Sequence, residues 1–347
     1  MEIPDLLAFA RSQHASDLHL SAGLPPLLRV HGDIRPIALP ALSAAEVRAL
    51  LHSMMDEGQR RQYAEAHECD FALAWPDSGR CRVNVFSQQR GPAAAIRLIP
   101  EHAPALEHLG APPAVCALDR LPHGLVLVTG ATGSGKSTTL AALLARINAR
   151  RAAHILTIED PIEFIHPCQL SVVHQREVGR HTHGFATALR AALREDPDVI
   201  LLGEMRDADT MRLALTAAET GHLVFGTLHT SSATKTVDRI VDVFPGDEKD
   251  IVRAMLSESL RAVVSQTLLK RRDGQGRLAA YEIMLGTPAI RNLIRENKIA
   301  QMYSVMQTSQ QAGMQTLDQA LQALVGAGLV SADEARMRAV DKDALAA

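Results

Sequence analysis

The chain has 347 residues and a formal net charge of −3, and 47% of its residues are hydrophobic while 22% are charged. These fractions are typical of folded globular proteins and exclude extensive disorder. A chain of this length is expected to form about two domains, each with a core that needs no disulfide or structural metal. The near-neutral charge gives no electrostatic reason to expect a nucleic-acid partner.

No apolar run approaches the roughly 18 residues of a membrane span, and the acidic start of the chain is unlike the basic start of a signal peptide. We therefore expect a cytoplasmic protein. The four cysteines form no C-x-x-C pair. The sequence thus predicts free thiols in a reducing compartment and no zinc site.

The first hundred residues are expected to form a small α+β domain. Short extended segments separated by glycine and proline turns fill residues 15–40. Ser43 and Glu46 have the spacing of a capping box, which predicts a helix from there to about Met55. Further strands are expected at 71–75, 81–86 and 94–99, with a hairpin turn at 76–79.

Prolines then concentrate between Pro100 and Pro122, where the chain has five of them. Proline at this density favours a stiff connector without regular structure. We therefore predict an N-terminal domain at 1–100, a linker at 101–118 and a second domain at 119–347.

In the second domain, short apolar strands alternate with helical segments, a pattern typical of a parallel sheet covered on both faces. The strands are expected at 125–128, 155–158, 199–202 and 223–225, and the helices between them at 136–149, 185–195 and 208–220. After residue 245 the pattern predicts helices alone, at 247–269, 287–296, 314–326 and 332–340.

A phosphate-binding motif opens this domain. Residues 130–137 read GATGSGKS and fit G-x-x-x-x-G-K-[ST], with a strand before the motif and a helix after it. The glycines let backbone N–H groups surround phosphate oxygens, Lys136 is expected to reach the β- and γ-phosphates, and the Ser137 hydroxyl is expected to bind Mg²⁺. The residues expected to contact ATP are Gly130, Ala131, Thr132, Gly133, Ser134, Gly135, Lys136, Ser137 and Thr138.

Two acidic segments follow strands of the expected sheet. Glu204 comes just after the strand at 199–202, at the edge where open α/β sheets bind ligands, and is the candidate carboxylate on the Mg²⁺ side. The segment 157–163 adds three acids after another strand, and one of them could orient water for attack on the γ-phosphate. The pattern alone leaves open which of the three does so.

Two histidines, His222 and His229, flank residues 223–228, so that one lies at each end of the strand expected there. A strand end can face bound phosphates, but the spacing of these histidines does not suggest zinc ligands. In the C-terminal region, Ile290, Leu293 and Ile294 have the i, i+3, i+4 spacing of one buried helix face. The basic residues of that helix are then expected to lie off the buried face.

Five motifs in order resemble the secretion ATPases of type II and type IV machines, and among these the pilus retraction members. The resemblance extends over about residues 5–340 and is carried by residues 15–20, 130–137, 157–164, 203–207 and 226–230. Residues 289–296 match a further motif of the retraction members. The chain lacks the four-cysteine insertion of the pilus-assembly and type II secretion members.

The resemblance implies a PAS-like α+β N-terminal domain followed by a RecA-like P-loop domain with a mostly parallel sheet and C-terminal helices. It implies that Glu163 is the catalytic residue that polarises water and that Glu204 ends the Walker B strand. It places His229 in the histidine box, and His222 matches a further family histidine.

In this family the N-terminal domain lends arginines to the nucleotide of a neighbouring subunit. Arg82 and Arg97 are the best matches to these arginines. The resemblance therefore implies a homo-hexamer whose sites are completed across subunit interfaces.

The predicted function is an ATP- and Mg²⁺-dependent hexameric motor that depolymerises type IV pili and so drives twitching motility. Its expected partners are the platform protein of the pilus machine at the inner membrane and a paralogous retraction ATPase, with no nucleic acid.

Alternatives stay open from the sequence. The first is an accessory retraction ATPase that depends on another motor, and the second is a nucleotide-dependent regulatory or binding module with little turnover. A DNA-handling P-loop protein is a weaker third alternative, disfavoured by the net charge.

Overall fold

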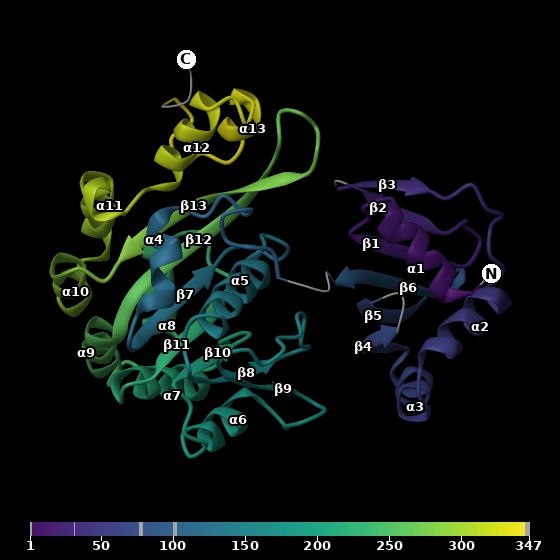
Figure 1. Cartoon of the computed structure of the whole chain (residues 1–347), viewed down its shortest axis with the longest axis horizontal. Helices are drawn as coiled ribbons and strands as arrows, with labels where there is room; N and C mark the ends of the chain where they lie inside the picture. Colours follow the sequence, from purple (N-terminus) through teal and green to yellow (C-terminus); the bar gives the residue numbers. More distant parts are fainter. Residues whose placement is uncertain (1, 31, 76–78, 100–102, 344–347) are drawn as a thin grey trace. The chain divides into compact units, whose positions relative to one another are not determined.

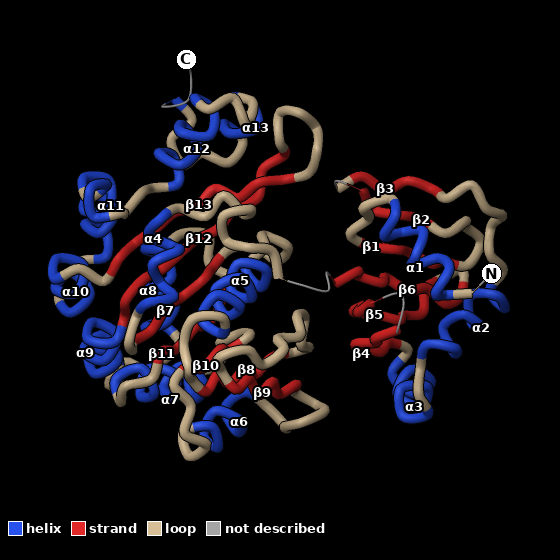
Figure 2. Tube along the Cα trace, viewed as in Figure 1, coloured by secondary structure: helices blue, strands red, loops and turns tan. Residues whose placement is uncertain are grey.

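The computed structural model describes residues 2–30, 32–75, 79–99 and 103–343. The predicted turn residues 76–78 and the first residues of the predicted linker lie outside these ranges. The chain divides into two compact units, the first formed by Met1–His102 with Glu163–Ile165 and the second by Ala103–Ile162 and His166–Ala347. Figure 1 labels their elements and Figure 2 distinguishes helices from strands.

The first unit is an antiparallel sheet of six strands in the order β3-β2-β1-β6-β5-β4, with three helices. Its strands are β1 (Asp17–Ser21), β2 (Leu27–Val30), β3 (Asp33–Pro36), β4 (Glu68–Trp75), β5 (Gly79–Gln88) and β6 (Gly91–Ile99). Its helices are α1 (Ile3–Ser12), α2 (Ala44–Met54) and α3 (Glu57–Ala66). The predicted hairpin is confirmed, because β4 and β5 pair antiparallel from Trp75 and Gly79 onward.

Buried and more exposed side chains alternate along the strands, and this alternation shows which face of the sheet is buried. On β5, Cys81, Val83 and Val85 are buried in a core with α1 and α2, whereas Arg82 and the other even-numbered residues point to the opposite face. The predicted capping box at the start of α2 is confirmed by reciprocal hydrogen bonds between Ser43 and Glu46.

The second unit contains a seven-stranded sheet in the order β13-β12-β7-β11-β10-β8-β9. All neighbouring pairs are parallel except β12 with β13. Its strands are β7 (Gly124–Thr129), β8 (His154–Glu159), β9 (Val172–Glu177), β10 (Val199–Leu202), β11 (Leu223–Leu228), β12 (Leu260–Lys270) and β13 (Arg277–Leu285). The predicted fold class, α/β with a mostly parallel sheet, is confirmed.

Helices cover both faces of this sheet, because alternate residues of β7 enter opposite cores. Leu125 and Leu127 pack with α7, α8 and α9, while Val126 and Val128 pack with α4 and α5. The helices are α4 (Pro113–Cys116), α5 (Lys136–Asn148), α6 (Phe185–Ala192), α7 (Ala208–Glu219), α8 (Ala233–Asp242), α9 (Lys249–Ser259), α10 (Pro288–Arg295), α11 (Ile299–Thr308), α12 (Leu317–Gly326) and α13 (Ala332–Arg336), with 3₁₀ turns at Ala117–Arg120 and Gln310–Ala312. None of the helices in the described residues is long and apolar enough to cross a bilayer.

The helix predicted over 247–269 is wrong in its second half. Helix α9 ends at Ser259, and Leu260 begins β12, which pairs with β7 and β13. Most of β12 is buried, so it lacks the polar alternation that marks an exposed strand, and its apolar run continues the pattern of α9 without a visible break. The adjacent β-branched Val263 and Val264 are the local signal that favours a strand.

The predicted inner face of α10 is confirmed, because Ile290, Leu293 and Ile294 are all buried. Its arginines lie off that face. Arg291 donates to the carbonyl of Gly286, and Arg295 forms an ion pair with a glutamate of α9.

The described part of the predicted linker packs on the second unit. Leu106, Val115 and Leu118 are buried in the same core as the apolar face of α5. The described residues of the predicted linker thus belong to the second unit and include short helices with buried side chains, α4 among them, in place of the irregular chain that their prolines predict.

A buried carboxylate also ties this segment to α5. Asp119 is almost fully buried and accepts hydrogen bonds from Nε of Arg146 at 2.8 Å and from a terminal nitrogen of Arg150 at 3.0 Å. Arg146 also donates to Glu107 at 2.5 Å. Two arginines of the α5 region therefore hold two acids of the preceding segment.

Replacing Asp119 with Ala should lower the free energy of unfolding by about 3 kcal/mol, because it removes the buried partner of Arg146. Arg150→Ala should cost less than about 1 kcal/mol, since half of the Arg150 side chain is exposed. Urea denaturation of the two variants measures both values. Equal costs would contradict the assignment of Asp119 as the centre of this network.

Candidate active site

The phosphate loop joins β7 to α5, as its motif predicts. Gly130, Gly133 and Gly135 have φ angles of 137°, 76° and 92°, a region that favours glycine. A Cβ atom at Gly130 would lie 2.4 Å from the carbonyl oxygen of Gln266, and one at Gly135 would lie 2.8 Å from the Gln266 side-chain nitrogen. The loop conformation therefore depends on these glycines and on the residue beneath them.

The loop groups suit an anionic ligand. Lys136 is buried, and its Nζ donates to the carbonyl oxygens of Gly130 at 2.9 Å and Ala131 at 3.0 Å. The Ser134 hydroxyl is buried and has no hydrogen-bond partner among the described residues. Helix α5 begins at Lys136, so its positive end adds to the lysine charge. An unsatisfied hydroxyl, a lysine and a helix N-terminus together fit a phosphate group.

The remaining predicted loop residues are more accessible. Thr132 is exposed in the loop, and Ser137 and Thr138 lie in the first turn of α5, where Ser137 is exposed. The hydroxyl expected to bind Mg²⁺ is thus accessible at the start of the helix.

Gln266 is a site residue that the sequence did not reveal. It is buried on β12, and its Oε1 accepts a hydrogen bond from the Thr139 hydroxyl of α5 at 2.9 Å. With its carbonyl against Gly130 and its amide against Gly135, Gln266 supports both ends of the phosphate loop. No motif marks it, because its position follows only from the pairing of β12 with β7.

Glu204 and His229 meet at the same edge of the sheet as the phosphate loop. They follow β10 and β11, which run parallel to β7. Oε1 of Glu204 lies 3.1 Å from Nε2 of His229 and 2.7 Å from Nε of Arg206. Burial raises the pKa of Glu204, but the bonded Arg206 guanidinium and neighbouring positive charges outweigh this effect and bring the pKa below its ordinary value. Glu204 is therefore ionised at neutral pH, which suits the role on the Mg²⁺ side that is predicted for it.

The two glutamates of the acidic segment after β8 differ in their hydrogen bonds. Oε1 of Glu159 accepts hydrogen bonds from the Thr157 hydroxyl at 2.6 Å and from the Gln175 amide at 3.3 Å. Glu163 lies in the loop beyond the strand, and within the described part of the chain its carboxylate has no hydrogen bond or ion pair. Glu159 is thus held in the sheet, whereas Glu163 has both carboxylate oxygens available.

His222 lies at the other end of β11. Its carbonyl accepts a hydrogen bond from Gly124 at the start of β7, and its Nδ1 is 2.9 Å from the carbonyl oxygen of Ala217. The structure therefore brings His229, but not His222, to the edge that carries the phosphate loop.

The two predicted arginines form a cluster within the first unit. Arg82 of β5 is directly opposite Arg97 of β6, and Arg97 is directly opposite Asp17 of β1. Nε of Arg97 donates to the largely buried Asp17 carboxylate at 3.1 Å. Both arginines lie on the sheet face away from the helices of this unit.

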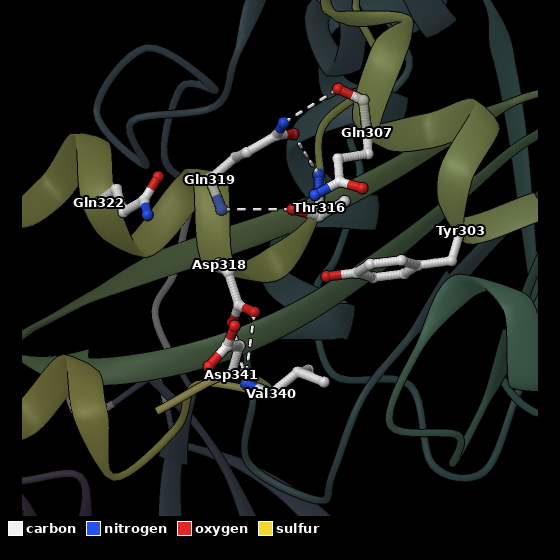
Figure 3. Close-up of a pocket in the computed structure, with 8 residues that line it drawn as sticks. All are labelled: Tyr303, Gln307, Thr316, Asp318, Gln319, Gln322, Val340 and Asp341. Atoms are coloured by element: carbon white, nitrogen blue, oxygen red, sulfur yellow. Dashed lines mark hydrogen bonds between the residues drawn. The ribbon is translucent and has the colours of Figure 1, made fainter. Parts of the chain in front are cut away.

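A separate pocket of about 310 Å³ lies among the C-terminal helices (Figure 3). The Asp318 carboxylate there accepts hydrogen bonds from the backbone N–H groups of Val340 and Asp341, and Gln319 bonds Gln307 and Thr316. These bonds fasten the end of the described chain to α12. The pocket is lined by Tyr303, Gln307, Thr316, Asp318, Gln319, Gln322, Val340 and Asp341.

Residues 3–337 match the family described as Type II/IV secretion system protein. The chain belongs to this family. It is 60% identical over 339 residues to the type IV pilus retraction ATPase PilT of Pseudomonas aeruginosa, which covers 98% of each chain. It is 42% identical to the type IV pilus ATPase PilU of the same organism, over 96% of this chain and 88% of that protein.

Among solved structures, a crystal structure of the pilus retraction motor PilT with bound ADP has a TM-score of 0.89 to this chain. Its sequence is 46% identical, and the match covers 99% of this chain and 98% of that one. The resemblance to secretion ATPases drawn from five short motifs is thereby confirmed over almost the whole chain. The roles assigned to single site residues stay predictions.

Gly135→Ala should lower ADP affinity by about tenfold or more, because the new Cβ is strained at this φ and meets the Gln266 amide. Gly246→Ala is the matched control, since a Cβ there has open space and no positive φ is involved. Titration with fluorescent ADP compares them. Unchanged affinity in Gly135→Ala would show that ADP does not need this loop conformation.

Proposed function

We propose that this protein hydrolyses ATP and uses the free energy to retract type IV pili. The arrangement at one edge of the sheet supports the proposal most directly. The phosphate loop, the buried Lys136 and the Glu204–His229 pair lie together there, in a chain 60% identical to a pilus retraction ATPase. The bound ADP of the PilT crystal structure supports a nucleotide as the ligand.

Each group at this edge has a distinct task in phosphoryl transfer. Lys136, the Ser134 hydroxyl and the N-terminus of α5 bind and neutralise phosphate oxygens. The Ser137 hydroxyl and the Glu204 carboxylate, partly through water, would hold Mg²⁺, which when bound supplies further positive charge to the phosphates. His229 keeps Glu204 oriented by its contact at 3.1 Å.

Glu163 is the acid that we assign to the attacking water. A residue that orients water needs a carboxylate oxygen that is not already committed. Glu159 is engaged by Thr157 and Gln175, whereas Glu163 carries no such bonds among the described residues. This difference supports Glu163, the member of the acidic segment that the family resemblance also favours.

The site is completed by arginines of a neighbouring subunit in a homo-hexamer. Arg97 is half exposed, and its one hydrogen bond in the described part of the chain is made through Nε. This leaves the terminal nitrogens of its guanidinium for an anion, and Arg82 is its neighbour in register. The ring works in the cytoplasm, held at the inner membrane by the pilus platform protein.

The two main alternatives are less well supported. An accessory retraction ATPase would be expected to match PilU at least as well as PilT, yet the identities are 42% and 60%. A binding module with little turnover has no need for Lys136, Glu163 and Glu204 together. A paralogous ATPase stays in the proposal as a partner of the motor.

Glu163→Gln should reduce kcat by about 100-fold or more while ADP affinity stays within about twofold, because the substitution removes the charge that polarises water and leaves the phosphate loop intact. Cells with this variant as their only copy should lose twitching motility. Glu159→Gln is the matched control and should have the smaller effect on kcat. The reverse order would assign the water to Glu159.

Subunit mixing tests the shared site. Lys136→Ala and Arg97→Ala chains should each be inactive alone, and their mixture should recover part of the ATPase activity. Recovery is expected because some interfaces then combine an intact phosphate loop with an intact Arg97. ATP turnover after mixing at several ratios is the measurement, and two Lys136→Ala preparations mixed together are the control. An active monomer would refute the shared site.

A further inference from the structure

The loop that carries Glu163 is anchored on both sides of this residue by side chains of β9. Before it, the backbone N–H of Ile162 donates to Oε2 of Glu177 at 3.1 Å. After it, the backbone N–H of His166 donates to Oε1 of Gln175 at 2.9 Å. The stretch between the two anchors is only three residues long, so the anchors restrict where Glu163 can lie.

The two anchors belong to one face of the edge strand. Gln175 pairs in register with Thr157 of β8, and Glu177 pairs with Glu159. Being two residues apart, Gln175 and Glu177 project to the same side of the sheet. No sequence motif marks either residue, yet the pairing of β9 with β8 directs both side chains toward the loop that follows β8.

Burial makes the Glu177 contact costly to lose. Glu177 is 8% exposed and Ile162 is 5% exposed, so neither the carboxylate nor the backbone N–H can exchange its partner freely for water. Both polar atoms of the Gln175 side-chain amide form hydrogen bonds: the nitrogen donates to Glu159 at 3.3 Å, and the oxygen accepts from the backbone N–H of His166. Gln175 thus links the engaged acid of the segment to the loop of the available one.

A third anchor connects the same loop to the phosphate-binding helix. Asn148, the last residue of α5, is almost fully buried. Its side-chain nitrogen donates to the carbonyl of Pro167 at 2.7 Å, and its side-chain oxygen accepts from the N–H of Gln169 at 3.0 Å. The loop is therefore fixed both to β9 and to the helix that starts with Lys136.

We propose that Gln175 and Glu177 are positioning residues for ATP hydrolysis, which hold the backbone on either side of Glu163 so that its carboxylate meets the attacking water. The inference rests on the proposed role of Glu163. Displacing a reacting group by about 1 Å can cost about 100-fold in rate. Two hydrogen bonds that flank the catalytic residue are well placed to prevent such a displacement.

The variants for the test distinguish the loss of the anchoring hydrogen bonds from the loss of the Glu177 charge and from a loss of stability of β9. Glu177→Leu and Gln175→Leu remove the acceptor oxygens with little change in size. Glu177→Gln keeps an acceptor oxygen and removes the charge. Arg176→Met is the matched control, because Arg176 lies between the two on β9, alternates to the other face and pairs with Glu195.

Both leucine variants should lower kcat by about 10- to 100-fold, with ADP affinity within about twofold of the unchanged protein. Glu177→Gln should retain most of the activity, and Arg176→Met should retain nearly all of it. ATP turnover, ADP titration and the melting temperature of the full chain are the measurements. A parallel loss of ADP affinity and kcat, or an equal loss in Arg176→Met, would overturn the proposal.

The decisive arm combines Glu177→Leu with Glu163→Gln. If Glu177 acts through Glu163, the double variant should be within about twofold of Glu163→Gln alone, because there is no carboxylate left to position. Independent, multiplying losses would overturn the proposal while leaving the role of Glu163 intact. A mild effect of Glu163→Gln by itself would instead refute the role of Glu163, so the two failures are distinguishable.

If Glu177→Leu does not fold, Gln175→Leu can be combined with Glu163→Gln in the same double-variant comparison. Its side chain lies on the same face and bonds the far side of the loop, at His166. Activity unchanged in a folded Gln175→Leu chain would overturn the proposal for that residue.

Discussion

Parallel pairing of β7, β11 and β10 is the constraint on which the rest of the site depends. Thr129 at the end of β7 is in register with Leu228 of β11, so the phosphate loop and His229 emerge side by side. Leu202 at the end of β10 is in register with Gly226, which brings the chain toward Glu204 to the same edge. The register of the strands therefore brings groups from three distant parts of the sequence to one edge of the sheet.

The turn after β10 is then fixed from both sides. The N–H of Met205 donates to the carbonyl of Thr227, and the Thr227 hydroxyl donates to the carbonyl of Gly203. On the other side, a Cβ atom at Gly203 would lie 3.2 Å from Cα of Glu159. The backbone beside Glu204 is thus held between β11 and β8. This fixed backbone orients the Glu204 carboxylate together with the contacts from Arg206 and His229.

Sequence patterns revealed the parts of this protein whose chemistry and spacing are local. The phosphate loop, the capping box at Ser43 and the strand before Glu204 each depend on residues a few positions apart, and all three were predicted. Gln266, Gln175 and Glu177 act across strands that pair only in the folded sheet, so no local spacing marks them. The order of strands, and not their composition, decides which polar side chains reach the site. The same limit explains why the sequence pattern predicts a helix where β12 lies.

The position of β12 in the sheet has a consequence for folding during synthesis. β7 and its phosphate loop are synthesised early, but the strand that pairs with one side of β7 begins only at Leu260. Until the ribosome has released that strand, the nascent chain has a P-loop motif whose supporting Gln266 is missing and whose strand has an open edge. Contacts of such long sequence separation form late and slowly. The support that Gln266 gives to the phosphate loop therefore forms only after the chain through β12 has been synthesised.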